Sequence, residues 1–253
     1  MGAGLRTSRG NSKGKYFKFF DGNFTREFYN KKPKGISAEE ERHLLDRTTS
    51  KGNVIYYIPY ETLQGHIVEG IIENNEKINQ LQLKLVFSDG EQEMTFFDNA
   101  DYRRAKSFYK RVPNIDFSKP VLFRAYKFTP DDKDKPIQGY TVYQGDNFTE
   151  KIEPHYTRET PNGLPKPTHN QIKDTWNFDE QDEFLMNVFN EKMEEVVEMN
   201  SDKRVGNYMD NEGYSEETKK FAAGDVAEDD VPTAPPSAPQ PSNDGPDDDD
   251  LPF

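Results

Sequence analysis

Residues 81–97 read LQLKLVFSDGEQEMTFF. Leucine or phenylalanine stands at every second position of this stretch up to Phe87, with mostly polar residues between. A period of two is typical of a strand with one buried face and one wetter face. The sequence Ser88-Asp89-Gly90 favours a tight turn, and a second apolar run follows it. The stretch therefore predicts an antiparallel β-hairpin in a protein that is mainly β.

Strand-like runs separated by turn residues continue on both sides of this hairpin. One helix interrupts them over Tyr102–Val112, and Asp101 is expected as its N-cap. Three strands, a helix and two more strands is the order of an OB-fold, a five-stranded barrel. We therefore expect a mainly β (β+α) fold, an OB-fold-like Greek-key barrel whose first three strands start at His66, Ile78 and Gln92. The predicted strands are Val54–Tyr60, His66–Glu73, Ile78–Phe87, Gln92–Phe97, Pro120–Phe128 and Pro136–Tyr143.

Composition divides the chain into four segments. Near the N-terminus, Ser37 followed by Glu39, Glu40 and Glu41 predicts a short capped helix. Near the other end, five prolines between residues 231 and 241, with acidic residues on either side, predict disorder. The segments are a basic, aromatic N-terminal extension (1–52), the OB-like barrel (53–160), a turn-rich segment plus an amphipathic helix (161–200), and a disordered acidic, Pro-rich tail (201–253).

The C-terminal helix is predicted over residues 179–199, with Asp179 as its N-cap. Its apolar residues recur at helical spacing and form one stripe. Packing of this stripe on the barrel is the simpler interpretation, and docking of a partner protein is the alternative. The stripe consists of Phe184, Leu185, Val188, Phe189, Met193, Val196 and Val197.

Charge is distributed unevenly along the 253 residues, whose formal net charge is −13. Residues 1–170 contain 27 Lys and Arg against 23 Asp and Glu, whereas residues 171–253 contain 6 against 23. The first 35 residues alone contain 9 basic and 2 acidic side chains. A mildly basic, aromatic-rich body therefore carries an acidic tail.

Several classes of protein are excluded or disfavoured. No apolar run approaches the ~20 residues that span a bilayer, and residues 1–11 lack the apolar stretch of a signal peptide. The absence of cysteine excludes disulfides, iron–sulfur clusters and thiolate zinc sites, and is in keeping with a reducing cytoplasm. The four histidines have no metal-ligand spacing, and no phosphate-binding Gly-x-x-x-x-Gly-Lys motif occurs. We therefore expect no cofactor, no membrane partner and no catalytic activity.

The last seven residues combine three features in one short peptide. Four aspartates supply an anionic field, a proline limits the freedom of the chain, and a terminal phenylalanine joins an aromatic ring to the chain carboxylate. A partner with an apolar pocket and a basic rim can bind all of them together. This predicted partner-binding tip consists of Asp247, Asp248, Asp249, Asp250, Leu251, Pro252 and Phe253.

This tip resembles the C-terminus of bacterial single-stranded DNA-binding proteins, where acidic residues precede Ile-Pro-Phe. The overall layout is similar to that of phage-encoded proteins of this kind, with a Pro-rich linker and an acidic, aromatic-ended tail. The resemblance covers about seven residues. It implies binding of single-stranded DNA (ssDNA) and recruitment of replication, recombination or repair enzymes through the tip. For a phage protein it also implies a location in the bacterial host cytoplasm.

Binding of single strands without sequence recognition needs cations for phosphates and flat rings for bases. The N-terminal segment interleaves both, although Phe17 and Phe19, or Phe20, also fit a core strand flanked by lysines. In the predicted strand Pro120–Phe128, Arg124 and Tyr126 face a groove if Val121 and Phe123 face the core. The predicted DNA-binding residues are Lys13, Lys15, Tyr16, Lys18, Arg26, Tyr29, Lys31, Lys32, Lys34, Tyr57, Lys84, Arg103, Arg104, Lys110, Arg111, Arg124 and Tyr126.

The sequence thus predicts a non-enzymatic protein that coats and protects ssDNA during replication, recombination and repair. Whether it also forms a homo-oligomer is left open. One alternative is an adaptor or inhibitor that docks on host DNA-repair enzymes through the same tip. A second is a metal-dependent nuclease that uses Glu91 and Glu93 or Asp98 and Asp101, although turn and capping roles explain these four carboxylates more simply.

Overall fold

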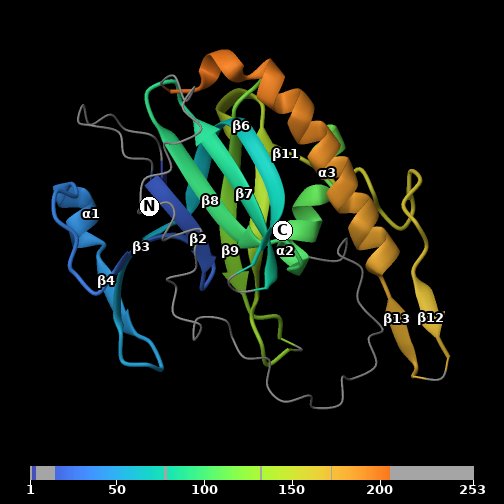
Figure 1. Cartoon of the computed structure of the whole chain (residues 1–253), viewed down its shortest axis with the longest axis horizontal. Helices are drawn as coiled ribbons and strands as arrows, with labels where there is room; N and C mark the ends of the chain where they lie inside the picture. Colours follow the sequence, from blue (N-terminus) through green and yellow to red (C-terminus); the bar gives the residue numbers. More distant parts are fainter. Residues whose placement is uncertain (1, 4–14, 77–78, 132, 172, 206–253) are drawn as a thin grey trace.

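The computed structural model describes residues 2–3, 15–76, 79–131, 133–171 and 173–205. One mixed sheet of eleven strands dominates them, in the order β11-β10-β9-β6-β7-β8-β2-β3-β5-β4, with β1 paired to β6 (Figure 1). Two short strands, β12 and β13, form a separate hairpin. The strands are β1 (Gly2–Ala3), β2 (Lys15–Phe20), β3 (Asn23–Tyr29), β4 (Leu45–Thr48), β5 (Val54–Tyr60), β6 (Thr62–Asn75), β7 (Gln80–Ser88), β8 (Glu93–Asn99), β9 (Val121–Phe128), β10 (Ile137–Gln144), β11 (Glu150–Lys151), β12 (Thr168–Asn170) and β13 (Thr175–Asn177).

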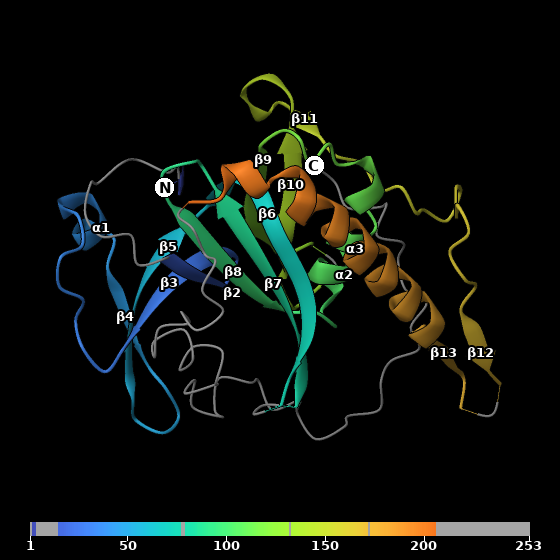
Figure 2. The same cartoon turned by 45° about the horizontal axis from the view of Figure 1, so that its top comes forward.

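Three α-helices accompany the sheet in the described part of the chain. Helices α2 and α3 lie together on one face of it, while α1 lies beside β4 at the far end of the molecule (Figures 1 and 2). Short 3-10 turns follow α2, β10 and α3. The helices are α1 (Ala38–Arg42), α2 (Arg103–Tyr109) and α3 (Asp179–Met199).

The mainly β prediction is confirmed, and each of the six predicted strands is present within a few residues of its expected bounds. In the hairpin β7–β8, Leu83, Leu85 and Phe87 are fully buried, as the period of two predicts. The predicted phase of β9 is also confirmed, since Phe123 is buried and Arg124 is exposed.

The closed five-stranded barrel is not observed, so this part of the prediction was wrong. Strand β6 lies between β9 and β7 in the sheet, and β8 does not pair with β10. The parallel strand β2 occupies that edge of β8 instead, with Phe17 opposite Phe96. Because both edges of β8 are used, the sheet stays open and continues into β3, β5 and β4. The segment expected as an extension, residues 1–52, therefore contributes four strands, β1 to β4, to the main sheet.

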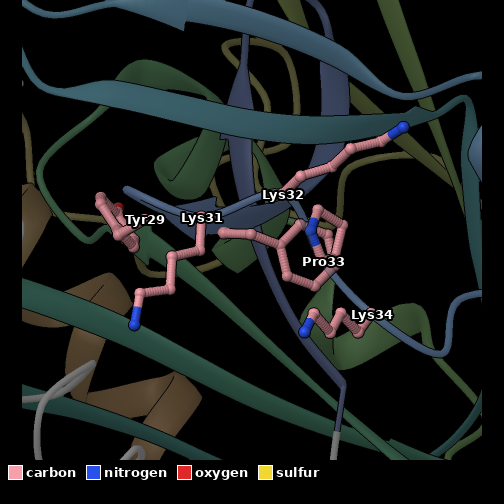
Figure 3. Close-up of a pocket in the computed structure, with 6 residues that line it drawn as sticks. Tyr29, Lys31, Lys32, Pro33 and Lys34 are labelled. Carbon is pink, nitrogen blue, oxygen red and sulfur yellow. The ribbon is translucent and has the colours of Figure 1, made fainter.

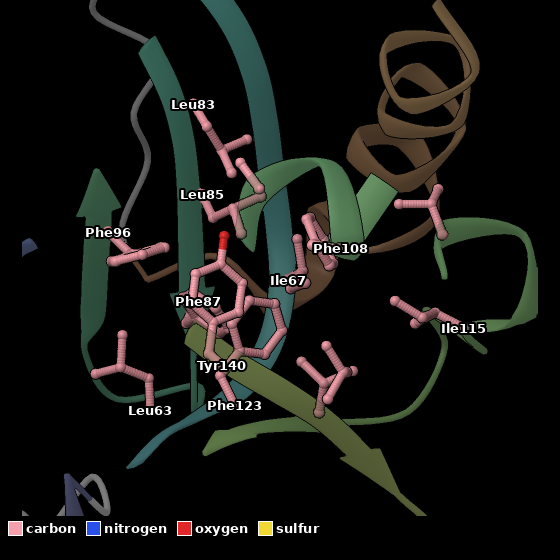
Figure 4. Close-up of a cluster of buried hydrophobic side chains, with 14 of the residues drawn as sticks. Leu63, Ile67, Leu83, Leu85, Phe87, Phe96, Phe108, Ile115, Phe123 and Tyr140 are labelled. Atoms are coloured by element: carbon pink, nitrogen blue, oxygen red, sulfur yellow. The ribbon is translucent and has the colours of Figure 1, made fainter. Parts of the chain in front are cut away.

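The core of the sheet is an aromatic cluster around Tyr140 (Figure 4). The centroid of the Tyr140 ring lies 5.8 Å from Phe19, 6.0 Å from Phe24, 5.7 Å from Phe96 and 5.3 Å from Phe123. These rings come from five different strands. The sheet therefore curls until β10 packs on β2, β3 and β8 through side chains rather than through backbone hydrogen bonds.

The apolar stripe of helix α3 packs on this sheet, which agrees with the simpler of the two interpretations of the sequence. Phe189 is fully buried, and its ring lies 5.3 Å from Tyr109 and 6.0 Å from Phe108 of α2. Leu185, Met193 and Val196 are also buried, but Val197 is 39% exposed and lies outside the stripe.

The helix ends agree only partly with the sequence predictions. Ser37 and Glu40 form the expected reciprocal capping box at α1. The two predicted aspartate caps were wrong, because Tyr102 and Phe178 occupy the N-cap positions of α2 and α3 and neither makes a side-chain cap. Asp179 lies in the first turn of α3, where its negative charge stabilises the helix by interacting with the positive end of the helix dipole.

The chain remains anchored beyond α3, past the predicted start of the tail at residue 201. The buried side chain of Asn200 donates hydrogen bonds to the carbonyls of Ile67 and Phe117, both at 2.8 Å. Arg204 pairs with Glu69 of β6. The rest of the predicted tail, residues 206–253 with the tip at 247–253, lies outside the described residues, as does Lys13.

The close contact between β6 and α3 gives a first prediction. A Cβ atom on Gly70 would lie 2.5 Å from the Met193 sulfur and 2.9 Å from Phe189. Gly70→Val should therefore push α3 outward and lower the free energy of unfolding by about 1–3 kcal/mol. Chemical denaturation measures this, with Ile71→Val as the control because Ile71 is 41% exposed. Equal stability of the two variants would contradict the packing described.

Candidate nucleic-acid interface

Alternation along β2 sends its aromatic rings to opposite faces of the sheet. Phe17 is buried on the face covered by α2 and α3, whereas Phe20 is 36% exposed on the other face. Strand register places Lys18 opposite Thr25 of β3, and Glu27 of β3 opposite Tyr57 of β5. These side chains therefore share the face that the helices leave uncovered.

On this face an arginine and two rings pack together. The Arg47 guanidinium lies 4.4 Å from the centroid of the Phe20 ring, and the Tyr57 ring meets Phe20 edge-on at 5.9 Å. Leu45, the residue opposite Tyr57 on β4, is 48% exposed. We call Phe20, Arg47 and Tyr57 the stacking face, because the flat guanidinium of Arg47 lies over the Phe20 ring and the Tyr57 ring meets that ring edge-on.

A buried carboxylate organises the cations around the stacking face. The side chain of Glu27 is only 3% exposed. It accepts a 2.7 Å hydrogen bond from the Tyr29 hydroxyl and a 3.3 Å hydrogen bond from the Arg47 guanidinium. Lys18 donates to the Tyr29 hydroxyl at 3.1 Å and lies 3.7 Å from Glu27. One negative charge therefore holds two positive side chains in place.

Beyond β3 the chain forms a shallow hollow whose rim is rich in lysine (Figure 3). Lys31 and Lys34 are exposed, and Lys32 bonds to Glu41 of α1 at 3.2 Å. Tyr29 belongs to both sites, since it lines the hollow and bonds to Glu27. We call this the lysine hollow; its lining residues are Phe28, Tyr29, Lys31, Lys32, Pro33 and Lys34.

Two predicted DNA-binding cations are held by one carboxylate of α1 instead. Arg26 donates to Glu40 at 3.1 Å, and Lys15 lies 3.8 Å from the same oxygen. The Tyr60 hydroxyl also donates to Glu40, at 2.8 Å. Burial alone would raise the pKa of Glu40, but the Ser37 N–H, Tyr60 and the two cations together lower it.

Other predicted cations also belong to internal ion pairs. Lys84 donates to Glu69 at 2.6 Å. Arg104 makes a two-pronged pair with the buried Asp98, at 2.8 and 2.5 Å, and its guanidinium lies 4.5 Å from the Phe19 ring. Burial alone would lower the pKa of Arg104, but the Asp98 carboxylate raises it. These two side chains hold strands and a helix together in the described structure.

The remaining predicted residues are not part of the stacking face. Arg103 begins α2 and Lys110 is its C-cap, while Arg111, in the turn after the helix, donates to the carbonyl of Ile152 at 3.0 Å. On β9, the Arg124 guanidinium lies 4.9 Å from the Tyr143 ring, and Tyr126 contacts Phe128 at 6.1 Å. In the order of the sheet, β6, β7 and β8 lie between β9 and β2, but the sheet curls, and Lys127 of β9 pairs with Asp21 in the turn after β2. Tyr16 stacks on Phe97 of β8 at 6.4 Å, beside Lys18.

Phe20 and Arg47 of the stacking face are not among the residues predicted from the sequence to bind DNA. The sequence does contain a feature that predicts the orientation of Phe20, namely the turn at Asp21 and Gly22. A two-residue turn places Phe20 opposite Asn23, and this register determines the face of the sheet on which each aromatic ring of β2 lies. Arg47 falls in residues 36–52, which the sequence pattern assigned to a short helix and a loop, so no strand phase was available for it.

The chain was compared with models of protein families, with curated proteins and with solved structures, and none of the three comparisons gives a match. Among the described residues, no helix is both long and apolar enough to cross a membrane. Nor do they contain a group of three or more His, Asp or Glu side chains arranged to hold a metal ion. Function is therefore inferred from the geometry of the described residues and from the sequence.

The Glu40 cluster predicts a specific dependence of stability on pH. Because folding lowers the pKa of Glu40 below its ordinary value of 4.5, this carboxylate stabilises the fold above that value, and the contribution is lost as the pH falls through the lowered pKa. Glu40→Gln should therefore be less stable than the wild type at pH 7, and the difference should shrink below pH 4.5. Urea denaturation across pH measures it. A difference that is constant across pH, or that grows in acid, would contradict this assignment.

Proposed function

We propose that this protein binds single-stranded DNA on the face of the sheet that α2 and α3 leave uncovered. The observation that carries the proposal is the stacking face, where the Phe20 ring contacts both the guanidinium of Arg47 and the ring of Tyr57. Bases of any sequence can stack on such groups, because every base has a flat π-face. Lys31 and Lys34 of the lysine hollow follow directly along the chain from β3 and supply charge for phosphates.

The proposed mechanism is retention of the strand without chemistry. Rings on β2 and β5 fix the positions of the bases, and the lysines neutralise the backbone. The antiparallel pairing of β3 with β5 holds the stacking face rigid before the strand arrives, so that little ordering is needed on binding. Coating of this kind would protect exposed strands in replication, recombination and repair.

The proposal includes a separate role for the C-terminal tip. Its acidic run and terminal Leu251-Pro252-Phe253 would recruit replication, recombination or repair enzymes, as the resemblance to single-stranded DNA-binding proteins implies. For a phage-encoded protein this would occur in the cytoplasm of the bacterial host. Deletion of Phe253 alone should abolish enzyme recruitment and leave DNA affinity nearly unchanged. If the tip binds enzymes but the chain has no affinity for DNA, the alternative function of an adaptor or inhibitor of host DNA-repair enzymes is favoured.

The phosphate contacts predict the salt dependence of binding. Fluorescence anisotropy with a labelled oligo-dT should give an affinity that falls with salt at a log–log slope of about −0.7 per neutralised phosphate. Lys31→Gln/Lys34→Gln should flatten that slope, by about 0.7 for each lysine that contacts a phosphate. The matched control is Lys119→Gln/Lys192→Gln, which removes the same charge elsewhere. Equal slopes for the two double variants would remove the lysine hollow from the DNA path.

The stacking contacts predict the effect of removing a ring. Phe20→Ala should weaken oligo-dT binding by about 1–3 kcal/mol, because one base loses its stacking partner. Stability should change little, since Phe20 is partly exposed. Met199→Ala serves as the control, because Met199 is 46% exposed at the end of α3. If Phe20→Ala unfolds at a lower denaturant concentration and the folded fraction binds normally, Phe20 has only a structural role.

A further inference from the structure

The hairpin β12–β13 projects from the body at the end of the molecule opposite α1 (Figures 1 and 2). All six residues of its two strands are exposed. It carries Trp176, the single tryptophan of the chain, which is 47% exposed and lies 4.7 Å from the His169 ring. Phe178, directly after the hairpin, is 43% exposed.

An isolated two-stranded hairpin is marginally stable in water, and neighbouring exposed aromatic rings mark interaction sites. Part of the support for this hairpin comes from Gln181, which donates to the carbonyl of Pro165 at 2.6 Å. That contact fixes the base of the hairpin and leaves the tryptophan ring outside. We call Thr168–Asn170, Thr175–Asn177 and the following Phe178 the aromatic arm.

The charge next to the aromatic arm identifies the kind of surface that would bind it. Asp179, Glu180 and Glu183 are exposed in the first turns of α3. The acidic helix start disfavours a nucleic acid at this place and favours a basic partner surface with apolar walls. The lysine hollow has this composition, because three lysines surround Phe28, Tyr29 and Pro33.

The arm and the hollow cannot meet within one molecule, because they lie at opposite ends of its long axis: the hollow is next to α1, and the arm is beyond the start of α3 (Figures 1 and 2). We propose that the aromatic arm of one copy docks in the lysine hollow of another copy. Trp176 and Phe178 would pack on Phe28 and Pro33, while the acidic start of α3 would face the lysines.

This contact is heterologous, since two different surfaces meet. Each added copy therefore leaves one arm and one hollow unoccupied, and association is open-ended rather than closed in a symmetric dimer. The lysines of the hollow also belong to the proposed DNA surface, so an arm and a DNA strand are expected to compete for them. The experiment is therefore carried out without DNA.

Sedimentation velocity at low salt tests the proposal with two complementary variants of the full chain. Trp176→Ala removes the arm contact and leaves the hollow intact, whereas Lys31→Glu/Lys34→Glu does the reverse. The wild type should form species that grow with concentration, and each variant alone should remain a monomer. An equimolar mixture should form a one-to-one dimer that does not grow, because only one arm and one hollow are functional in each pair.

Lys119→Glu/Lys192→Glu is the charge-matched control and should associate like the wild type. Emission of the single tryptophan should shift to shorter wavelength as the wild type associates, since its ring leaves water. A monomeric wild type at all concentrations, unchanged association of Trp176→Ala, or a mixture that stays monomeric would each overturn the proposal. None of these results bears on ssDNA binding, which the oligo-dT titration tests independently.

Discussion

Pairing of β2 with the edge of β8 is the constraint on which the rest of the structure depends. The parallel register, with Phe17 opposite Phe96 and Lys18 opposite Phe97, sets which side chains of β2 enter the core. It also occupies the edge that would otherwise be free to pair with β10, so the sheet cannot close into a barrel. The same pairing sends Phe20 to the open face, where Arg47 and Tyr57 meet it.

A second interaction keeps this arrangement fixed from the core side. Arg104 of α2 pairs with the buried Asp98 at the end of β8 and lies against the Phe19 ring of β2. Breaking a buried pair by removing one partner typically costs about 3–5 kcal/mol, because the other charge is left uncompensated. A helix, two strands and a ring are thereby held together at the position where β2 joins the sheet.

The sequence predicts the six strands β5 to β10 and the capped helix α1, because these depend on local patterns. Alternation fixed the buried face of β7, and Ser37 with Glu40 fixed the start of α1. Barrel closure was not predictable in this way, because it depends on which strand, distant in the sequence, pairs with the edge of β8. The distance to a carboxylate in the folded structure also determines which cations are held in internal ion pairs. The sequence alone does not distinguish Arg26 and Lys84 from Lys31. In the structure, however, Arg26 pairs with Glu40 and Lys84 pairs with Glu69.

The central claim is that DNA lies on the open face of β2 and β5. Ultraviolet crosslinking of an oligo-dT containing 5-iododeoxyuridine, followed by mass spectrometry of the peptides, locates the bases directly. The account predicts crosslinks at Phe20 and Tyr57. Crosslinks confined to Tyr126 and Phe128 on β9, with none in β2 or β5, would contradict it.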